Sequence, residues 1–485
     1  MADTVKTATK LFGAMLALAL TNTACAADWK FGAGVSAGET YTDNVALAPP
    51  GAAQSDWITE ITPTLSAVKN GARFKADVRY SLQNLFYARD RNRNQIYHQL
   101  DARANTELYE KELFLDTSAS IRQAATSPLG ATGANNTNAT GNISNVRTLT
   151  VSPYWIHRFG SMATLNARVG VSDVGYSNAS ISNSTNTTTN LTLAGGSTFS
   201  RTPWALNYSD QKVNYTSRPD VEFTTTSASL GYLVTSRVRL TGVTGYERNQ
   251  YLHTGSAPEG SFWEANVAWA VSPRTKLEVG LGDHYYGKTK MMSFNTHGGH
   301  LEWKADYNES VTTSNSQAST STAYLVTSGG APVGIFVDPT QIQTDSVFLN
   351  KRFQTALTWT RGRSAINASA YQSNQDALET GQVSSVLQNG AFQNTTSIKQ
   401  RGISAGWSYE LTPLMSATLS GNLTRSSYPG LGREDKDKFI QLGIKRKLSP
   451  HLSGAVNVRR QARDSNQSSA DYTENALTGS VNYTF

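Results

Sequence analysis

The sequence is nearly free of cysteine and lacks long apolar runs after its first residues. Cys25 is the only cysteine among 485 residues, which excludes an intramolecular disulfide and a multi-cysteine metal centre. Beyond residue 26, no stretch approaches the roughly 18 consecutive apolar residues that a transmembrane helix requires. Lysine and arginine outnumber acidic residues by 43 to 36, yet they form no basic run with interleaved aromatics. This distribution argues against nucleic-acid binding.

The N-terminal residues have the pattern of a secretory signal peptide. Lys6 and Lys10 precede an apolar run at 11–20, and Ala24-Cys25-Ala26 supplies the small residues of a cleavage site. A lipoprotein signal at Cys25 is the alternative, although Asn22 stands where such signals prefer leucine. We expect a signal peptide over 1–26 and cleavage after Ala26, which would remove the only cysteine and leave 459 residues.

The C-terminal residues alternate strictly between apolar and polar side chains. Leu477, Gly479, Val481, Tyr483 and Phe485 form an apolar stripe that stops on the terminal aromatic. This period of two predicts a β-strand. The edge strand of a soluble sandwich is one interpretation. The closing strand of an outer-membrane barrel is the other, and there Leu477, Val481, Tyr483 and Phe485 would act as a signal for the barrel-assembly machinery.

The same alternation recurs along the chain. At 73–82 one face is wholly apolar and the other is almost wholly charged, and similar segments lie at 99–108, 163–171, 263–271 and 403–411. Without a helix candidate, a bilayer can be crossed only by a closed barrel, whose strands satisfy one another's backbone groups. The pattern therefore predicts an all-β fold over 27–485, a single transmembrane antiparallel β-barrel of the outer membrane.

The connections between these segments alternate between short and long. Links such as Asn70-Gly71 and Thr412-Pro413 are tight, whereas 124–145 and 288–297 read as long polar loops. Outer-membrane barrels have short periplasmic turns and longer extracellular loops. Aromatics near predicted strand ends fit interfacial girdles, namely Trp29, Trp155, Trp204, Tyr232 and Trp359.

Residues 312–345 interrupt this rhythm. If the short turns are all periplasmic, parity requires one more crossing here, which predicts a strand around 320–328. The total is then about 22 strands, within a range of about 20–24. The alternative is that 312–345 folds inward as a constriction.

Charged faces of the predicted strands must point into the lumen, because an Arg or Lys facing lipid at mid-depth costs about 2–4 kcal/mol. The predicted pore-lining residues are Arg73, Lys75, Asp77, Arg79, Asp101, Arg103, Glu107, Arg168, Arg237, Arg239, Glu278, Lys304 and Arg352. One interpretation is a solvated wall whose opposite charges pair across neighbouring strands. The other is an aqueous pore for polar or anionic solutes. The two are compatible.

Enzyme motifs occur only in unsuitable contexts. The residues from Gly282 to Thr289 match the letters of a P-loop, but no helical period follows to hold phosphates. Two G-x-S-x-G matches, around Ser36 and Ser404, lie inside alternating strands. His297 and His300 form the only close histidine pair, without a carboxylate at ligand spacing. We predict no catalytic residues, no cofactor and no metal site.

Four segments carry a family resemblance, namely the residues from Glu39 to Pro49, Tyr80 to Tyr87, His98 to Asn105 and Val347 to Arg352. They resemble outer-membrane β-barrel proteins associated with PEP-CTERM/exosortase systems of Gram-negative bacteria. The resemblance implies an outer-membrane location and a link to exopolysaccharide production. It supplies no catalytic residues.

These observations lead to an expected function. We expect a non-enzymatic conduit or envelope component for polysaccharide export. A passive porin for small polar or anionic solutes is the alternative, and a structural or adhesive barrel that depends on loops such as 124–145 is the third. Expected partners are outer-membrane lipid and lipopolysaccharide, the barrel-assembly machinery and polysaccharide, with no nucleic acid.

Overall fold

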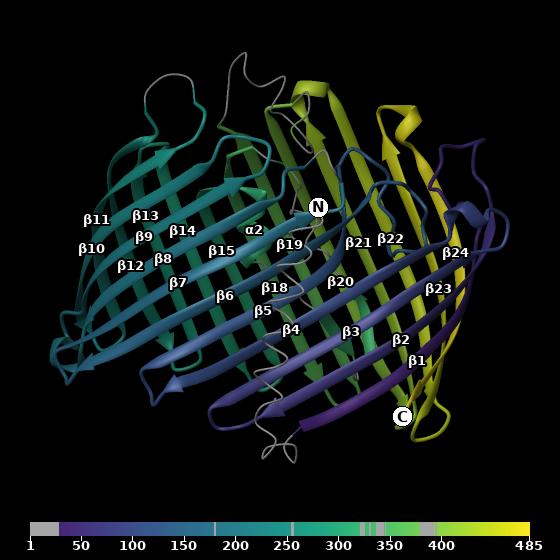
Figure 1. Cartoon of the computed structure of the whole chain (residues 1–485), viewed down its shortest axis with the longest axis horizontal. Coiled ribbons are helices and arrows are strands. Elements are labelled where there is room, and N and C mark those ends of the chain that lie inside the picture. Colours follow the sequence, from purple (N-terminus) through teal and green to yellow (C-terminus); the bar gives the residue numbers. More distant parts are fainter. Residues whose placement is uncertain are drawn as a thin grey trace.

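The computed structural model of the chain is a closed β-barrel (Figure 1). It describes residues 29–178, 181–253, 257–320, 325–328, 331–335, 344, 346–378, 392 and 395–485. One 22-stranded sheet contains every barrel strand, each antiparallel to its neighbours, and β1 pairs with β24 to close the ring. The predicted all-β transmembrane barrel is thereby confirmed. The predicted signal peptide lies outside the described residues.

The barrel strands are 10–17 residues long, so each can cross a bilayer at a tilt. Their bounds are β1 Trp29–Thr42, β2 Asp56–Asn70, β3 Phe74–Tyr87, β4 Gln95–Tyr109, β5 Leu113–Ala125, β6 Ile143–Phe159, β7 Ala163–Tyr176, β8 Ser184–Gly195, β9 Trp204–Tyr215, β10 Val221–Thr235 and β11 Val238–Gln250. The remaining strands are β12 Glu259–Ser272, β13 Thr275–His284, β14 Gly287–Gly298, β15 Leu301–Thr312, β18 Phe348–Arg361, β19 Ser364–Ala377, β20 Ser397–Thr412, β21 Met415–Tyr428, β22 Arg433–Lys447, β23 Leu452–Ser465 and β24 Tyr472–Thr484.

Alternate side chains on each strand form an apolar outer surface. Leu65, Leu230, Ile403 and Val456 are each more than half exposed, as a lipid-facing side chain must be when no lipid is included. The residues between them are mainly Ser, Thr, Asn, Gln and charged groups, which point into the lumen. Such a reversal of the usual inside and outside is stable only where the outer solvent is a bilayer.

Short turns occupy one end of the barrel, here called the short-turn end. Ten turns connect strand pairs there, from β2–β3 to β22–β23, and the chain's C-terminus lies at the same end (Figure 1). Gly160, Gly299 and Gly362 have positive φ values in these turns, a conformation that glycine adopts without strain. The opposite end, called the loop end, carries most of the longer connections.

The strand count is as predicted, but one strand lies elsewhere. Residues 288–297, predicted as a loop, belong to β14, and the tight turn between His284 and Gly287 replaces the long connection. The alternation in β14 is weak, because its outer face begins with Lys288 and Lys290 and because Met291 points inward. Because this alternation is weak, the sequence also did not predict the turn at 298–301. The parity argument then placed the missing strand wrongly at 320–328.

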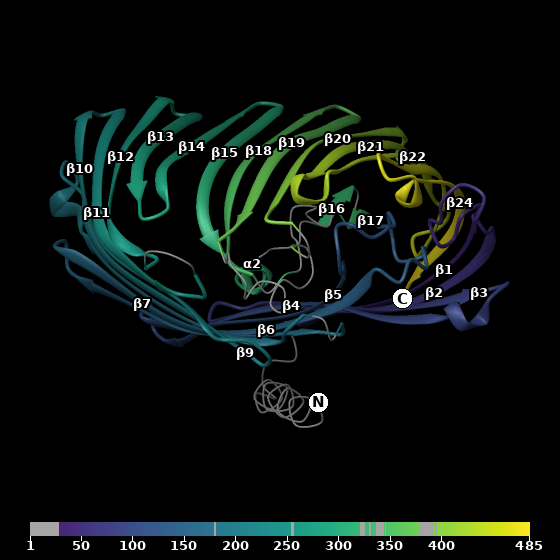
Figure 2. The same cartoon turned by 90° about the horizontal axis from the view of Figure 1, so that it is seen from above.

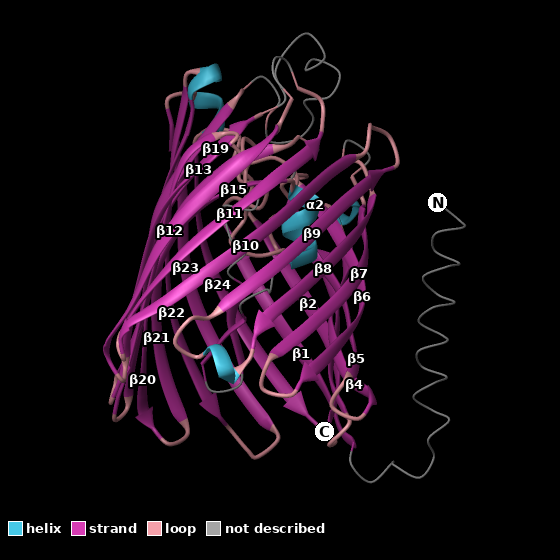
Figure 3. Ribbon diagram, turned by 90° about the vertical axis from the view of Figure 1, so that its left-hand side faces the viewer, coloured by secondary structure: helices cyan, strands magenta, loops and turns pink. Residues whose placement is uncertain are grey.

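Within 313–345, the described residues add no strand to the barrel wall. This segment begins with the short helix α2, Ser314–Thr320, and contains a separate two-stranded sheet of β16, Leu325–Ser328, and β17, Ala331–Ile335. Viewed from above, α2, β16 and β17 lie within the ring of strands (Figure 2). The side view places α2 towards the loop end (Figure 3). The alternative prediction of an inward fold therefore describes these residues better. None of the helices in the described part of the chain is long and apolar enough to span a membrane.

Candidate functional site

The strands enclose a polar lumen, and the charges on β3 and β4 are locally balanced. On β3 and β4, Asp77 lies opposite Arg103 and Arg79 lies opposite Asp101. Within each strand the ion pairs are direct, with Arg79 Nη2 3.0 Å from Asp77 Oδ2 and Arg103 Nη2 3.3 Å from Asp101 Oδ2. The four side chains form an alternating block with no net charge. The recorded ion pairs of this block therefore run along each strand, while the register places opposite charges side by side across the two strands.

Arg168 on β7 is held by groups from two neighbouring strands. Its Nη1 donates to Asp116 Oδ2 at 2.8 Å and to Ser152 Oγ at 3.1 Å, and its guanidinium lies 4.0 Å from the centre of the Tyr154 ring. Asn105 Nδ2 donates to the other Asp116 oxygen at 2.6 Å. This arginine is fixed against the wall instead of reaching into the pore.

The other predicted pore-lining residues are spread around the barrel. Arg73 and Arg237 lie in turns at the short-turn end, at the rim of the lumen. Lys75, Glu107, Arg239, Glu278, Lys304 and Arg352 lie on the lumen-facing sides of their strands. Lys304 Nζ is 2.6 Å from Glu302 Oε1 on the same strand. The predicted residues do not converge on one ring.

Much of the remaining lumen wall is neutral and polar. Lumen-facing hydroxyls and amides bond across neighbouring strands, as in Ser369 Oγ to Ser404 Oγ at 2.6 Å and Ser209 Oγ to Asn190 Oδ1 at 2.9 Å. Thr192 Oγ1 likewise donates to Asn207 Oδ1 at 3.1 Å. Such groups can exchange these hydrogen bonds for bonds to the hydroxyls of a passing solute.

The connection between β5 and β6, residues 126–142, folds into the lumen and is called the inner segment. Its Asn138 Nδ2 donates to Glu474 Oε1 on β24 at 2.9 Å, and its Oδ1 accepts from Gln461 Nε2 on β23 at 3.0 Å. Glu474 also binds Arg459 through both oxygens, at 2.9 and 3.2 Å. Glu474 is fully buried and Asn138 is 1% exposed. The inner segment was predicted as an extracellular loop, so that prediction was wrong for these residues.

Further contacts attach the inner segment along its length. Arg433 Nη2 donates to the Leu129 carbonyl at 2.9 Å, and Arg463 Nη1 donates to the Gly130 carbonyl at 2.8 Å. On the other side, Tyr87 Oη donates to the Thr137 carbonyl at 3.0 Å. Leu129 also packs on an apolar cluster that contains Phe348, Phe392 and Tyr428. The inner segment therefore contacts strands from β3, β18 and β21–β24 at the loop end.

A second inward connection begins at α2. Asn315 is fully buried, and it accepts from Tyr176 Oη at 3.0 Å and donates to Ser184 Oγ at 2.6 Å. Tyr176 ends β7 and Ser184 begins β8, whereas α2 follows β15. Seven strands separate β8 from α2 in the order around the barrel, so these bonds cross the lumen.

Apolar side chains also pack across the lumen, between β9–β10 on one side and β15–β18 on the other. Val347, just before β18, belongs to a buried cluster with Val213 of β9 and Val221 of β10, on which Val311 of β15 also packs. The β14–β15 ladder covers Met292–Gly298 and Leu301–Tyr307 and stops short of the loop end. From above, the end of β15 bends towards α2 and the opposite wall (Figure 2). The lumen is thus pinched at the loop end.

A histidine lies between two carboxylates on the lumen side of β11–β13. His284 Nδ1 is 3.0 Å from Glu247 Oε1 and its Nε2 is 3.3 Å from Glu264 Oε1. His284 ends β13, whereas Glu264 lies within β12 and Glu247 lies within β11, and no local motif joins them in sequence. In the adjacent turn, burial raises the pKa values of the Tyr285 and Tyr286 hydroxyls. Sequence reasoning missed this cluster because the register alone brings its members together.

The motif matches lie on hairpins. The P-loop letters from Gly282 to Thr289 span the end of β13, a tight turn and the start of β14. Ser36 lies within β1, and Ser404 lies within β20. His297 and His300 flank the turn between β14 and β15.

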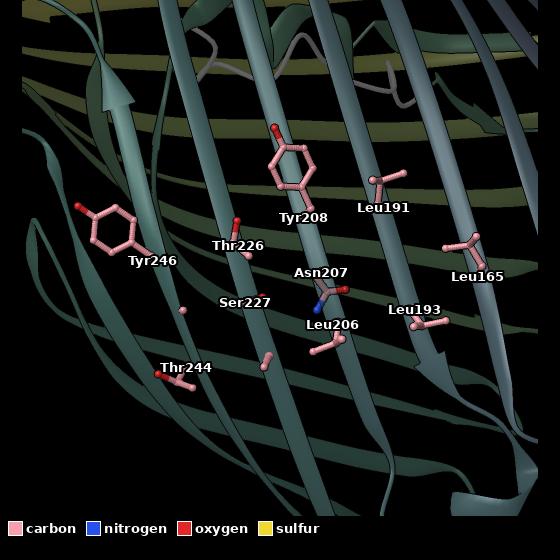
Figure 4. A pocket seen from close by; sticks show the side chains of 12 residues that line it. Leu165, Leu191, Leu193, Leu206, Asn207, Tyr208, Thr226, Ser227, Thr244 and Tyr246 are labelled. Carbon is pink, nitrogen blue, oxygen red and sulfur yellow. The ribbon is translucent and has the colours of Figure 1, made fainter.

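Two apolar hollows lie on the outer surface, not in the lumen. One, of about 540 Å³, lies over β8–β11 and is lined by Leu191, Leu206, Tyr208, Thr226 and Tyr246, among others (Figure 4). Another, of about 720 Å³, lies beside the C-terminus and is lined by Phe31, Leu65, Tyr80, Leu100 and Phe485. Both lie on the apolar outer face of the barrel. Leu477, Val481, Tyr483 and Phe485 are on this outer face, and their role as an assembly signal stays a prediction.

Comparison with known proteins gives a family-level likeness. A family model described as "Putative beta-barrel porin 2" matches residues 372–485. None of the curated proteins compared with the chain matches it. Among solved structures, the siderophore receptor PirA from Acinetobacter baumannii is 9% identical, with 93% of this chain and 80% of that chain covered and a TM-score of 0.47.

Two further solved structures are similarly distant. The ferric-catecholate import receptor Fiu from E. coli K12 is 9% identical, covers 94% of this chain and 82% of its own length, and has a TM-score of 0.49. OccK8 (OprE) from Pseudomonas aeruginosa is 11% identical, with coverages of 95% and 98% and a TM-score of 0.33. At these identities no function is transferred.

The closed barrel, its apolar outer surface and the porin family model all agree with a β-barrel in the outer membrane. The chain is a closed β-barrel protein of the Gram-negative outer membrane, and its residues 372–485 are similar to a porin family. Its short-turn end is periplasmic and its loop end is extracellular.

Proposed function

We propose that the protein is a non-enzymatic outer-membrane conduit for polar solutes, closed at its extracellular end in the state described. The observation that carries this proposal is the pairing of a wide polar lumen with two inward connections. A barrel of 22 strands is too wide for its own side chains to fill. Here the inner segment and α2 occupy the extracellular part, and each is anchored by buried hydrogen bonds.

The lining favours neutral or weakly charged, hydroxyl-rich solutes. The charged block on β3 and β4 carries no net charge, and β8, β9, β19 and β20 present hydroxyls and amides. Carbohydrates make many hydrogen bonds to such groups. The resemblance to exosortase-associated barrels adds a link to exopolysaccharide. We therefore propose polysaccharide export as the role, with passive diffusion of small polar solutes as the alternative.

The test combines conductance with a cellular phenotype. Purified protein in planar bilayers should show low conductance that rises when residues 127–141 are replaced by a short Gly-Ser link. Loss of the gene should reduce cell-surface polysaccharide if export is the role. Normal polysaccharide together with reduced uptake of small polar solutes would support the passive porin instead. A deletion variant that stays as closed as the parent would contradict the conduit proposal in both versions.

An adhesive role based on the inner segment finds no support in its geometry. Thr137 and Asn138 are 2% and 1% exposed inside the barrel, where a partner outside the cell would not reach them.

A further inference from the structure

The outer surface of the barrel carries an uneven band of charge just above the apolar belt. On β20–β23 its extracellular part presents six outward cations, Lys399, Arg401, Arg425, Lys436, Lys438 and Arg460, against two acids, Glu434 and Asp464. These eight side chains are called the cationic patch. They share the outward side of their strands with the exposed Ile403, Leu423, Ile440 and Val458.

The register places like charges next to each other in this patch. Arg401 on β20 is directly opposite Arg425 on β21, and Arg425 is directly opposite Lys436 on β22. Residues opposite each other in adjacent antiparallel strands have Cβ atoms about 4.5–5.5 Å apart, and like charges there are destabilising. Lys436 is in turn opposite Asp464 on β23, so this row holds three cations and one acid and carries a net positive charge that an external anion would offset.

The internal ion pairs leave that row incompletely neutralised. Glu434 pairs with Arg425, and Asp464 pairs with Lys438. Arg460 donates to Asn475 Oδ1 at 3.1 Å. Among the described residues, no ion pair is recorded for Lys399, Arg401 or Lys436. The net charge of the patch is +4, from six cations and two acids.

Outward cations on β9, β11 and at the start of β14 lie beside acids, whereas Lys290 lies opposite Leu281. Arg248 on β11 is 4.0 Å from Glu259 on β12. Lys288 on β14 is directly opposite Asp283 on β13. Lys212 on β9 is 4.0 Å from Asp220. The excess positive charge is therefore a local property of β20–β23 and does not follow from the overall basic composition.

The apolar belt begins two residues below the cations. Ile403 follows Arg401 and Ile440 follows Lys438 on the same outward face, and both are more than half exposed. Two residues of a strand span about 7 Å. An occupant must therefore place acyl chains against the belt and several anionic oxygens immediately above them.

We propose that the cationic patch binds the phosphate groups of an outer-leaflet glycolipid. A phosphorylated glycolipid with several acyl chains meets both requirements, because its phosphates lie at the level of the patch while its chains cover Ile403, Leu423, Ile440 and Val458. Arginine and lysine form charge-assisted hydrogen bonds with phosphate oxygens. The site is independent of whether the lumen conducts.

Native mass spectrometry of the delipidated full barrel tests this assignment. The probes are bisphosphorylated lipid A, the same lipid A after removal of both phosphates, and phosphatidylglycerol. The patch variant carries Lys399→Gln, Arg401→Gln and Lys436→Gln. The matched control carries Arg248→Gln, Lys288→Gln and Lys290→Gln, which removes as much positive charge from the outward ends of β11 and β14. Heat-dependent gel migration verifies that each variant is folded.

The parent should bind bisphosphorylated lipid A at least about tenfold more tightly than the dephosphorylated form. The patch variant should lose that preference, the control should keep it, and Arg401→Lys should keep most of it. Equal binding of both lipid A forms by the parent would overturn the proposal, as would equal losses in the patch variant and the control. Equally tight binding of phosphatidylglycerol would overturn the assignment to a glycolipid.

Discussion

The attachment of the inner segment to the barrel wall can be broken at Asn138 with little change to the wall itself. Asn138→Ala removes the 2.9 Å bond to the Glu474 carboxylate and the 3.0 Å bond from Gln461. A hydrogen bond to a charged group contributes about 1.5–3 kcal/mol and a neutral one about 0.5–1.5 kcal/mol. The attachment should therefore weaken by about 2–4 kcal/mol, which shifts the ratio of attached to detached segment by about 30-fold to 1,000-fold.

Glu474 keeps its main partner in this variant. Arg459 still contacts both carboxylate oxygens, and Thr42 Oγ1 still donates at 2.8 Å. No buried charge is left alone, so the barrel should fold normally. The contrasting change Glu474→Gln leaves Arg459 buried without its counter-charge, which costs about 3–5 kcal/mol, and it should lower folding yield as well as attachment.

Single-channel recording in planar bilayers measures the outcome. Asn138→Ala should increase the fraction of time spent in a high-conductance state, towards that of the variant with residues 127–141 replaced. Asn422→Ala is the matched control, since Asn422 faces the lumen from β21 opposite Ser404. If Asn138→Ala and Asn422→Ala gave the same open fraction while the replacement variant opened the pore, this hydrogen-bond network would not be what holds the segment.

Three further changes probe the wall. Leu442→Arg places a charge on the lipid-facing side of β22 and should cost about 2–4 kcal/mol in bilayer refolding titrations, whereas Gln441→Arg on the lumen side should cost much less. Arg168→Ala leaves Asp116 without its 2.8 Å ion pair, so the reversal potential in a salt gradient should shift towards cation selectivity; an unchanged potential would mean that ions do not pass this wall. Removing Phe485 should reduce the amount of heat-modifiable barrel in membranes without altering its conductance, and unchanged assembly would contradict its role as a signal.

The sequence predicts the barrel well because lipid imposes a period of two on every strand. The outward stripe from Leu477 to Phe485 is local, and so is the alternation at 73–82 in β3. Where that period fails, prediction fails with it. In β14, Lys288 and Lys290 face outward near the extracellular rim and Met291 faces inward, so the sequence predicted a loop at 288–297.

The inward connections could not be predicted, because their partners are distant in sequence. Asn138 and Glu474 are 336 residues apart, and Asn315 and Ser184 are 131 apart. An Asn-rich and Thr-rich connection has the same composition whether water or a polar lumen wall satisfies its hydrogen bonds. Only the closure of the barrel brings the wall to these residues.

The charge pattern of the lumen wall bears on how the proposed conduit would select solutes. Charge rings select when their field extends across a pore, but the block of Asp77, Arg79, Asp101 and Arg103 alternates in sign at the spacing of neighbouring side chains. Its field cancels within about one Debye length at physiological salt. The pinch between α2 and β7–β8 and the buried attachment of the inner segment are therefore the better candidates for control of passage. In the proposed conduit, selectivity would then depend on what displaces Asn138 from Glu474, and a hydroxyl-rich solute offers the same kinds of hydrogen bond that this network contains.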